Sequence, residues 1–280
     1  MELKIDKNVI ERFKNALVLE EKSANTIEKY LRDINAFWKF VGEQIVTKEL
    51  AIKYKEHLLT NEYAVRSVNS MIASLNSFFA FVGCENFKAK TIKEQGQIFC
   101  SEDKELTREE YNRLLVTAEN KGNKRLNLIL QTICGTGIRV SELEFITVEA
   151  VKKGEAVVFC KSKRRSVFIV KALQKKLLRY AAEQKIESGC IFITRSIKPV
   201  SRTNIWRDMK KLCKDANVNP EKVFLHNLRH LFARVFYGIE KDFAKLADIL
   251  GHSSINTTRI YIISTGTEHR QCTENMCLVI

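Results

Sequence analysis

Helical spacing of apolar residues dominates the first hundred positions of this 280-residue chain. Two long segments show it most clearly, "NTIEKYLRDINAFWKFVG" and "VRSVNSMIASLNSFFAFVG". Apolar side chains three or four positions apart share one face of a helix and can be buried together. These face-sharing residues are Ile27, Leu31, Ile34, Phe37 and Trp38 in the first segment and Val68, Ile72, Leu75 and Phe79 in the second. With shorter patterns near 7–19 and 47–59, the period predicts a four-helix domain over residues 1–84.

The boundaries of the helices are predicted from capping patterns. Asn25 with Glu28 predicts a capping box at the start of the second helix. Residues 85–105 lose the period and are polar, so we expect a linker there. The period returns after a second predicted capping box, at Thr107 and Glu110. Further helices are expected at 107–118, 123–134, 171–184, 201–216, 226–236, 241–250 and 254–262.

One segment of the second half has the pattern of strands. "EAVVFCKSKRRSVFIV" joins two β-rich runs by a tight basic turn, which predicts a β-hairpin. The expected fold is therefore mainly α with a small β-sheet. We expect a helical N-terminal domain over 1–84, a linker over 85–105, and an α+β domain with a C-terminal tail over 106–280.

The charge of the chain is unevenly distributed. The formal net charge is +14, and residues 1–100 carry 15 Lys and Arg against 13 Asp and Glu. Residues 101–280 carry 32 basic against 20 acidic side chains. A basic excess confined to one part of a protein favours a polyanionic partner, most simply nucleic acid.

Several classes of protein are disfavoured by composition. The apolar runs are too short to span a bilayer, and the N-terminus "MELKIDKNVIERF" does not have the pattern of a signal peptide. Eight cysteines occur without a CxxC pair, which argues against a disulfide framework and against a zinc ribbon. We therefore expect reduced thiols and a cytoplasmic location.

The segment "HNLRH" sets His226, Arg229 and His230 within five positions. His226 and His230 have the spacing of a zinc-binding pair on a helix, but Asn227 stands where a metalloprotease has its glutamate. The arginine would also repel a metal cation. The group is better suited to an anion than to a metal, and we expect no metal site.

Three further segments carry residues of the same character. "GTGIRVSEL" places Arg139 after a glycine-rich turn, where helix-start amides favour anions. The hairpin turn offers Lys161 and Lys163, and "LGHSSINTTRIYI" offers His252 with Tyr261 nine positions later. Each alone has an ordinary interpretation, as a surface arginine, a solvated lysine or a packed tyrosine.

Together and in this order, the segments resemble the tyrosine recombinase (phage-type integrase) family, which includes the Xer recombinases. The matching motifs are G-x-R-x-S-E-L, H-x-L-R-H, and L-G-H-S followed by tyrosine. The segment "SANTIEKYLRDINAFWKFV" is similar to the family's helical core-binding domain. The resemblance implies a SAM-like N-terminal bundle, a recombinase catalytic domain, and a site-specific recombinase that cleaves and rejoins DNA.

The resemblance also implies a role for each residue of the site. Tyr261 would attack a phosphodiester of double-stranded DNA and form a 3′-phosphotyrosine, without a metal ion or a cofactor. Arg139 and Arg229 would bind the phosphate oxygens. His226 would exchange a proton with Tyr261, and His252 would donate a hydrogen bond to the phosphate.

The resemblance implies that a lysine of the hairpin donates a proton to the departing 5′ oxygen. The hairpin is one residue shorter than the family's G-K-G-x-K-x-R turn, so alignment from one strand selects Lys161 and alignment from the other selects Lys163. We prefer Lys161. Two smaller departures, Asn227 and Leu231 within the histidine–arginine box, are expected to affect packing. We expect His230 to be structural and Glu142 to orient a basic group.

Alternatives remain at this stage. A type IB topoisomerase shares the chemistry, and a relative that binds DNA without cleaving it would share the fold. The resemblance implies self-association into a tetramer on two DNA sites. The apolar end "MCLVI" of the C-terminal tail calls for burial, against its own domain or against a neighbour. The sequence separates neither these two placements nor integration from dimer resolution.

Overall fold

The computed structural model describes residues 3–93, 105–160, 163–252, 254–261 and 274–276. The chain divides into two compact units, Met1–Gly96 and Gln97–Ile280. Each unit encloses a hydrophobic core of its own. The predicted boundaries of the domains and the linker stay a prediction, and residues 262–273 and 277–280 of the predicted tail lie outside the described residues.

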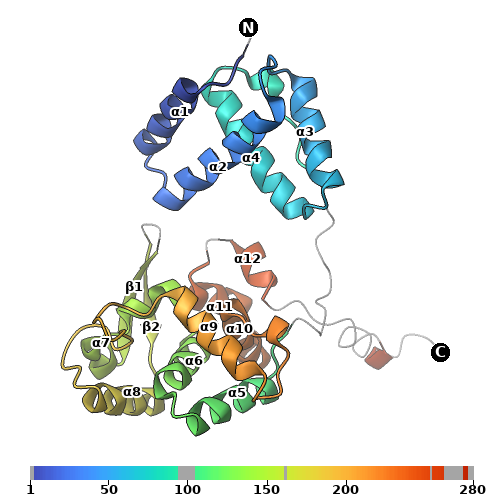
Figure 1. Ribbon diagram of the computed structural model, residues 1–280. Coiled ribbons are helices and arrows are strands. Elements are labelled where there is room, and N and C mark those ends of the chain that lie inside the picture. The colour runs from blue at the N-terminus through green and yellow to red at the C-terminus, as the bar shows by residue number, and fades with distance from the viewer. Residues whose placement is uncertain (1–2, 94–104, 161–162, 253, 262–273, 277–280) are drawn as a thin grey trace. The chain divides into compact units, whose positions relative to one another are not determined.

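The first unit is a bundle of helices, as the spacing of apolar residues predicts (Figure 1). Its elements are α1 (Lys7–Leu19), α2 (Ala24–Val41), α3 (Lys48–Thr60), α4 (Val65–Phe81) and the short 3₁₀ helix η1 (Glu85–Phe87). The core contains packed aromatic rings, with Phe37 edge-on to Tyr54 at 5.1 Å and to Phe79 at 6.0 Å. Edge-to-face geometry is the favourable arrangement for such rings.

The capping box predicted at Asn25 and Glu28 is wrong, because helix α2 begins earlier. Ser23 is the N-cap, and its hydroxyl accepts a hydrogen bond from the backbone N–H of Thr26 at 3.3 Å. Serine is among the best N-cap residues, so Ser23 caps the helix two positions before Asn25 could do so. The capping box predicted at Thr107 and Glu110 is confirmed at the start of α5.

The described part of the second unit is mainly helical with a two-stranded β-hairpin, and the predicted fold class is confirmed. Its helices are α5 (Arg108–Asn120), α6 (Lys124–Thr136), η3 (Val140–Phe145), α7 (Val148–Lys153), α8 (Lys171–Glu183), α9 (Arg202–Cys213), η4 (Pro220–Lys222), α10 (Leu225–Glu240), α11 (Phe243–Leu250) and α12 (Ile255–Arg259). The short helices η3, α7 and η4 were not predicted, because three to six residues are too few to show a helical period.

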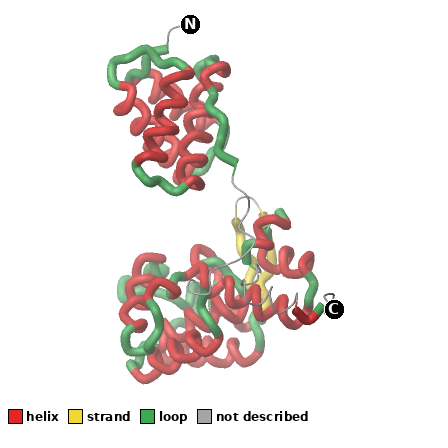
Figure 2. The backbone as a smooth tube through the Cα atoms, turned by 90° about the vertical axis from the view of Figure 1, so that its right-hand side faces the viewer, coloured by secondary structure: helices red, strands yellow, loops and turns green. Residues whose placement is uncertain are grey.

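The predicted hairpin is present as strands β1 (Glu155–Cys160) and β2 (Lys163–Phe168), drawn in yellow in Figure 2. The strands are antiparallel, and the last pair of the ladder joins Cys160 to Lys163. Side chains alternate between the two faces of a strand. Ala156, Val158 and Val167 are accordingly buried, whereas Arg164 and Ser166 are exposed.

Among the described residues, every helix is too short or too polar to cross a membrane.

The aromatic core of the first unit leads to a stability prediction. Phe37 is fully buried, so Phe37→Ala should lower the free energy of unfolding by about 3 to 5 kcal/mol, because a large cavity replaces the ring. Chemical denaturation of the whole chain measures this change. Lys39→Ala, on the exposed face of the same helix, is the control. A loss below about 1 kcal/mol for Phe37→Ala would contradict the packing described here.

Candidate active site

Arg139 is presented by a turn that requires glycine. Helix α6 ends at Gly137, which has the left-handed φ of +64°. A Cβ at this position would lie 2.6 Å from the ring of Phe232, so a larger residue does not fit. The chain then turns through buried Ile138 to Arg139, the residue before η3. The glycine-rich turn thus places the guanidinium at the end of α6, where it is partly exposed.

Glu142 holds Arg139 in place. This carboxylate is only 1% exposed, and it accepts hydrogen bonds from the backbone N–H and from Nη1 of Arg139, both at 2.9 Å. Burial by itself raises the pKa of the Glu142 carboxyl, but the hydrogen bonds from Arg139 and the charge of Arg165 outweigh burial and lower it. The expectation that Glu142 orients a basic group is confirmed.

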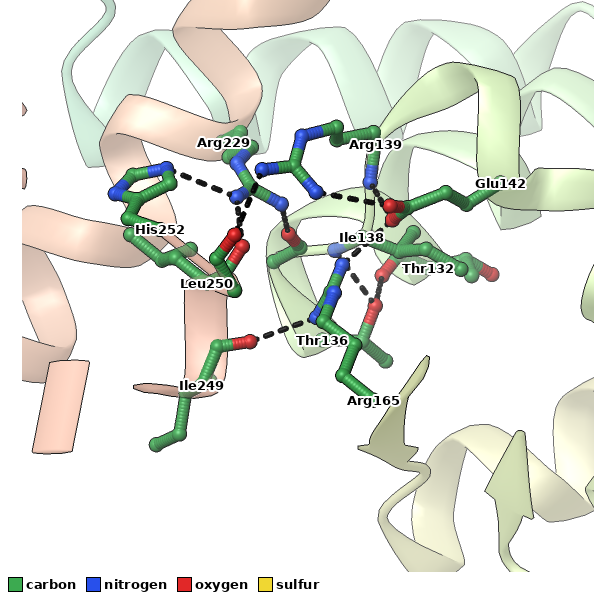
Figure 3. A network of polar contacts seen from close by, with 12 residues as sticks. Thr132, Thr136, Ile138, Arg139, Glu142, Arg165, Arg229, Ile249, Leu250 and His252 are labelled. Atoms are coloured by element: carbon green, nitrogen blue, oxygen red, sulfur yellow. Dashed lines mark hydrogen bonds and ion pairs between the residues drawn. The ribbon is translucent and has the colours of Figure 1, made fainter. Parts of the chain in front are cut away.

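Arg229 lies on helix α10 and is the largest fully buried side chain of the described residues. Its guanidinium donates to the backbone carbonyls of Gly137 and Leu250 and lies 3.2 Å from Nε2 of His252 (Figure 3). Burial first, and then the charge of Arg139, lower the pKa of Arg229 to about 10, so it stays charged at neutral pH. Nε of Arg229 is buried without a hydrogen-bond acceptor among the described residues.

Tyr261 follows helix α12 and is 5% exposed. Its hydroxyl lies 3.0 Å from Nε2 of His226. Its ring stacks on His230, with centroids 4.2 Å apart and planes at 25°, and the ring of His252 lies 5.0 Å away. The guanidinium carbon of Arg229 is 5.9 Å from the centre of the tyrosine ring. Tyrosine, three histidines and a buried arginine therefore meet at one place.

The hydrogen bonds of His252 assign its proton. Arginine is a donor only, so Nε2 of His252 accepts from Arg229 and the ring proton is on Nδ1. Nδ1 then donates to Oγ1 of Thr258 at 2.8 Å. Burial, followed by the charges of Arg229 and Arg139, lowers the pKa of His252 to about 4. His252 is therefore neutral near pH 7.

The two histidines of helix α10 are also kept neutral. His226 is exposed as a residue, but its ring packs against His230 and Tyr261. This partial burial, together with the charge of Arg229, lowers the pKa of His226. Burial and the neighbouring His226 lower the pKa of His230 to about 4. A neutral His226 can accept the proton of the Tyr261 hydroxyl.

The structure brings together Arg139, His226, Arg229, His252 and Tyr261, which come from three separate segments of the sequence. Lys161 lies outside the described residues, and the backbone of Lys163 begins strand β2. The roles predicted for all of these residues stay predictions.

Sequence reasoning missed a third arginine. Arg165, on strand β2, donates to Glu142 at 2.5 Å and to the carbonyl of Ile249 at 2.7 Å. Arg165 matches the arginine that ends the family's G-K-G-x-K-x-R turn motif. No role was assigned to that position from the sequence. His230, which is expected to be structural, also contacts the ring of Tyr261, and its role stays a prediction.

The charges at the site are unbalanced. One buried carboxylate, Glu142, pairs with the guanidiniums of both Arg139 and Arg165. Arg229 lies near Arg139, whose positive charge lowers the pKa of Arg229. Excess positive charge beside low-dielectric walls attracts an anion strongly. Arginine matches the planar geometry of phosphate oxygens. The chemistry of the site therefore fits a phosphate group next to Tyr261.

Two family models match most of the chain. The model of the phage integrase family matches residues 104–268. The phage integrase N-terminal SAM-like domain matches residues 10–86.

Curated relatives are tyrosine recombinases. XerA of Pyrococcus horikoshii is 30% identical over 282 aligned residues, which cover 98% of this chain and 95% of that protein. XerA of Thermococcus kodakarensis is 31% identical over 278 residues, 97% of this chain and 96% of that protein. XerC of Caldanaerobacter subterraneus is 30% identical over 162 residues, 56% of this chain and 46% of that protein.

Solved structures share the fold. The Tn1549 transposon integrase in complex with transposon right end DNA has a TM-score of 0.74 at 15% identity, covering 97% of this chain and 99% of that one. A lambda integrase tetramer bound to a Holliday junction has a TM-score of 0.73 at 17% identity, covering 91% and 76%. The crystal structure of XerA recombinase has a TM-score of 0.55 at 22% identity, covering 98% and 99%.

The stack of His230 on Tyr261 leads to a prediction about pH. The folded pKa of His230 is about 4, whereas the unfolded value is about 6.5, so the unfolded chain binds more protons between these values. Stability contributed by neutral His230 is therefore lost as pH falls from about 6.5 towards about 4. His230→Phe keeps an aromatic ring against Tyr261 but cannot be protonated.

We expect the melting temperature of His230→Phe to fall less than that of the wild type between about pH 7 and pH 5. Differential scanning calorimetry at both pH values measures the two decreases. Equal decreases in wild type and variant would show that His230 is not held neutral by its surroundings.

Proposed function

The chain belongs to the phage integrase family, and we propose that Tyr261 and the polar side chains around it carry out that family's exchange of DNA strands. The family predicted from the three motifs is confirmed. The chain is a tyrosine recombinase that cleaves and rejoins DNA in site-specific recombination. The assignment of roles rests on one observation above all, the Tyr261 hydroxyl placed 3.0 Å from His226 beside buried Arg229.

Cleavage begins with the phenol oxygen of Tyr261. As this oxygen attacks the phosphorus, His226 Nε2 accepts the phenol proton across the 3.0 Å contact. The bond from phosphorus to the 5′ oxygen breaks, which leaves a 3′-phosphotyrosine and a free 5′ hydroxyl. The covalent bond to Tyr261 conserves the energy of the broken linkage, so a 5′ hydroxyl can attack it and rejoin the strand without another source of energy.

The arginines stabilise the charge that develops on the phosphate. Arg139 is partly exposed and its fork points from the turn after α6, so it can bind one non-bridging oxygen. Arg229 uses its two terminal nitrogens on backbone carbonyls and has a buried Nε with no described acceptor. Donors fixed before the reaction need no rearrangement in the transition state, which is why such groups lower the barrier.

His252 requires a change of tautomer to act on the phosphate. In the structure its proton is on Nδ1, next to Thr258. To donate to a phosphate oxygen it must carry the proton on Nε2. The Thr258 hydroxyl supports both states, because it can accept from Nδ1–H or donate to an unprotonated Nδ1. We infer that DNA binding replaces the contact of His252 with Arg229 by a contact with phosphate.

A hairpin lysine, Lys161 in preference to Lys163, donates the proton to the departing 5′ oxygen in this proposal. The positive charge needed at the phosphate comes from side chains, so neither a metal ion nor a cofactor takes part. The topoisomerase alternative is not favoured, because the relatives over nearly the full chain are recombinases. The complete set of arginine, histidine and tyrosine side chains argues against a relative that only binds DNA.

The assembly and the location are further parts of the proposal. A strand exchange joins two duplexes, and lambda integrase, which shares the fold, forms a tetramer on a Holliday junction. We propose the same stoichiometry here: a tetramer on two double-stranded DNA sites. A DNA substrate supports a cytoplasmic enzyme, and the basic excess of residues 101–280 supports binding to phosphates.

The nucleophile is tested by Tyr261→Phe. The variant should form no covalent adduct with DNA but should bind it with nearly unchanged affinity, because only the hydroxyl is lost. Denaturing gels of the protein with a nicked suicide substrate measure the adduct, and mobility shifts measure binding. Tyr237→Phe, a nearby tyrosine on α10, is the control and should retain the adduct. Adduct formation by Tyr261→Phe would refute the assignment.

The phosphate contact is tested by Arg139→Ala. We expect the activation free energy of cleavage to rise by about 3 kcal/mol, the usual effect of removing one fixed donor to a developing anion. DNA affinity should change much less. Arg139→Lys should recover little, because an ammonium lacks the planar fork that can contact Glu142 and a phosphate oxygen together. Equal losses in affinity and in cleavage would mean that Arg139 serves binding alone.

The general acid is tested with a substrate whose bridging 5′ oxygen is replaced by sulfur. A thiolate leaves without a proton, so this substrate should restore cleavage to a variant that lacks the acid. We expect restoration for Lys161→Ala. Restoration for Lys163→Ala and not for Lys161→Ala would reverse the choice between the two lysines.

A further inference from the structure

Arg165 joins two parts of the site that are distant in the sequence. It lies on strand β2, and its side chain is only 12% exposed. Nη2 donates to Glu142 Oε2 at 2.5 Å, and Nη1 donates to the carbonyl of Ile249 at 2.7 Å (Figure 3). Glu142 is the carboxylate that holds Arg139, and Ile249 is near the end of α11, three positions before His252.

The stem of Arg165 is fixed as well as its guanidinium. The chain leaves α11 through Gly251, which has a left-handed φ of +63°. A Cβ on Gly251 would lie 2.5 Å from Cδ of Arg165. The backbone at Gly251 therefore passes close to the side chain of Arg165. Because glycine has no Cβ, the Arg165 side chain fits beside it. Strand β2 is thus locked to the turn that carries His252.

The strand register places this lock close to the start of strand β2. Arg165 pairs with Val158, and the last pair of the ladder is Cys160 with Lys163. Two positions along a strand correspond to about 7 Å. The backbone of Lys163, the first residue of strand β2, therefore lies within one such step of Arg165.

Charge balance argues that Arg165 does more than pair with a buried carboxylate. Arg139 already contacts both oxygens of Glu142, through its backbone N–H and its side chain. A second guanidinium on the same carboxylate adds a charge in a partly buried place, where an uncompensated charge is costly. A neutral donor would meet the hydrogen-bonding needs of Glu142 without adding this charge. The planar fork of arginine is needed to reach Glu142 and Ile249 together.

We propose that Arg165 is a positioning residue that holds the start of strand β2, at the backbone of Lys163, at a fixed place relative to Arg139 and His252. The inference rests on the proposed function, because it concerns delivery of the proton to the departing 5′ oxygen. Arg165 does not itself contact the reacting atoms. It sets the position of the general acid through the strand.

Arg165→Lys tests the proposal, since an ammonium keeps the charge but cannot span both acceptors. We expect cleavage of ordinary DNA to fall at least about tenfold, within the contribution of a general acid. On DNA with sulfur at the bridging 5′ position the loss should largely disappear, because that leaving group needs no proton. Arg164→Lys is the matched control, an exposed arginine at the next position of the strand, and should lose little on either substrate.

An equal loss for Arg165→Lys on the oxygen and sulfur substrates would overturn the proposal, because the arginine would then act on phosphate binding or on stability. Failure of the wild type to cleave either substrate would count against the proposed function instead. Amide hydrogen exchange over residues 155–168 provides a test that needs no activity. Exchange should be faster in Arg165→Lys than in the wild type or in Arg164→Lys, and unchanged exchange would overturn the proposal.

Discussion

The site depends on the burial of one cation, Arg229. Its guanidinium donates to the carbonyl of Gly137, which begins the turn to Arg139, and to the carbonyl of Leu250, which precedes the turn to His252. Both carbonyls lie at the ends of helices, where backbone acceptors lack partners within the helix. A single planar side chain therefore satisfies two helix ends and sets the distance between two functional turns. Lysine has neither the reach nor the geometry for both bonds, so the position is specific to arginine.

The arrangement trades stability for the ability to bind an anion. Arg229 on helix α10 is charged but only 2% exposed. In the contacts described, Glu142 forms ion pairs with Arg139 and Arg165 but not with Arg229. Burying a charge without an opposite charge costs free energy, which hydrogen bonds from carbonyls offset only in part. A phosphate supplies the missing negative charge. The groups that make the empty site unfavourable are therefore the same groups that favour the bound state, as expected for a preorganised site.

The sequence predicted the parts of the site that are written as contiguous motifs. Arg139, Arg229 and Tyr261 each stand at a fixed place in a short signature, and the structure brings all three together. Arg165 could not be found in this way, because its partners Glu142 and Ile249 are 23 and 84 positions away. Such contacts depend on how a strand packs against a helix end, which periodicity does not encode. The periodicity also does not fix where a helix begins. At the start of α2 the N-cap Ser23 sets the first residue of the helix.

The histidines connect the charge of the site with its chemistry. Partial burial and the arginine charges lower the pKa values of His226 and His252, so both rings are neutral while no anion is bound. A neutral ring can accept the phenol proton of Tyr261, but the arginine charges oppose the imidazolium that results. A phosphodiester carries a negative charge that acts against the arginine charges at short range, and it therefore favours a protonated His226. The phosphodiester thus makes His226 a stronger base towards the Tyr261 hydroxyl than it is without DNA. The excess of arginine that attracts the substrate also makes His226 a weaker base until the substrate arrives.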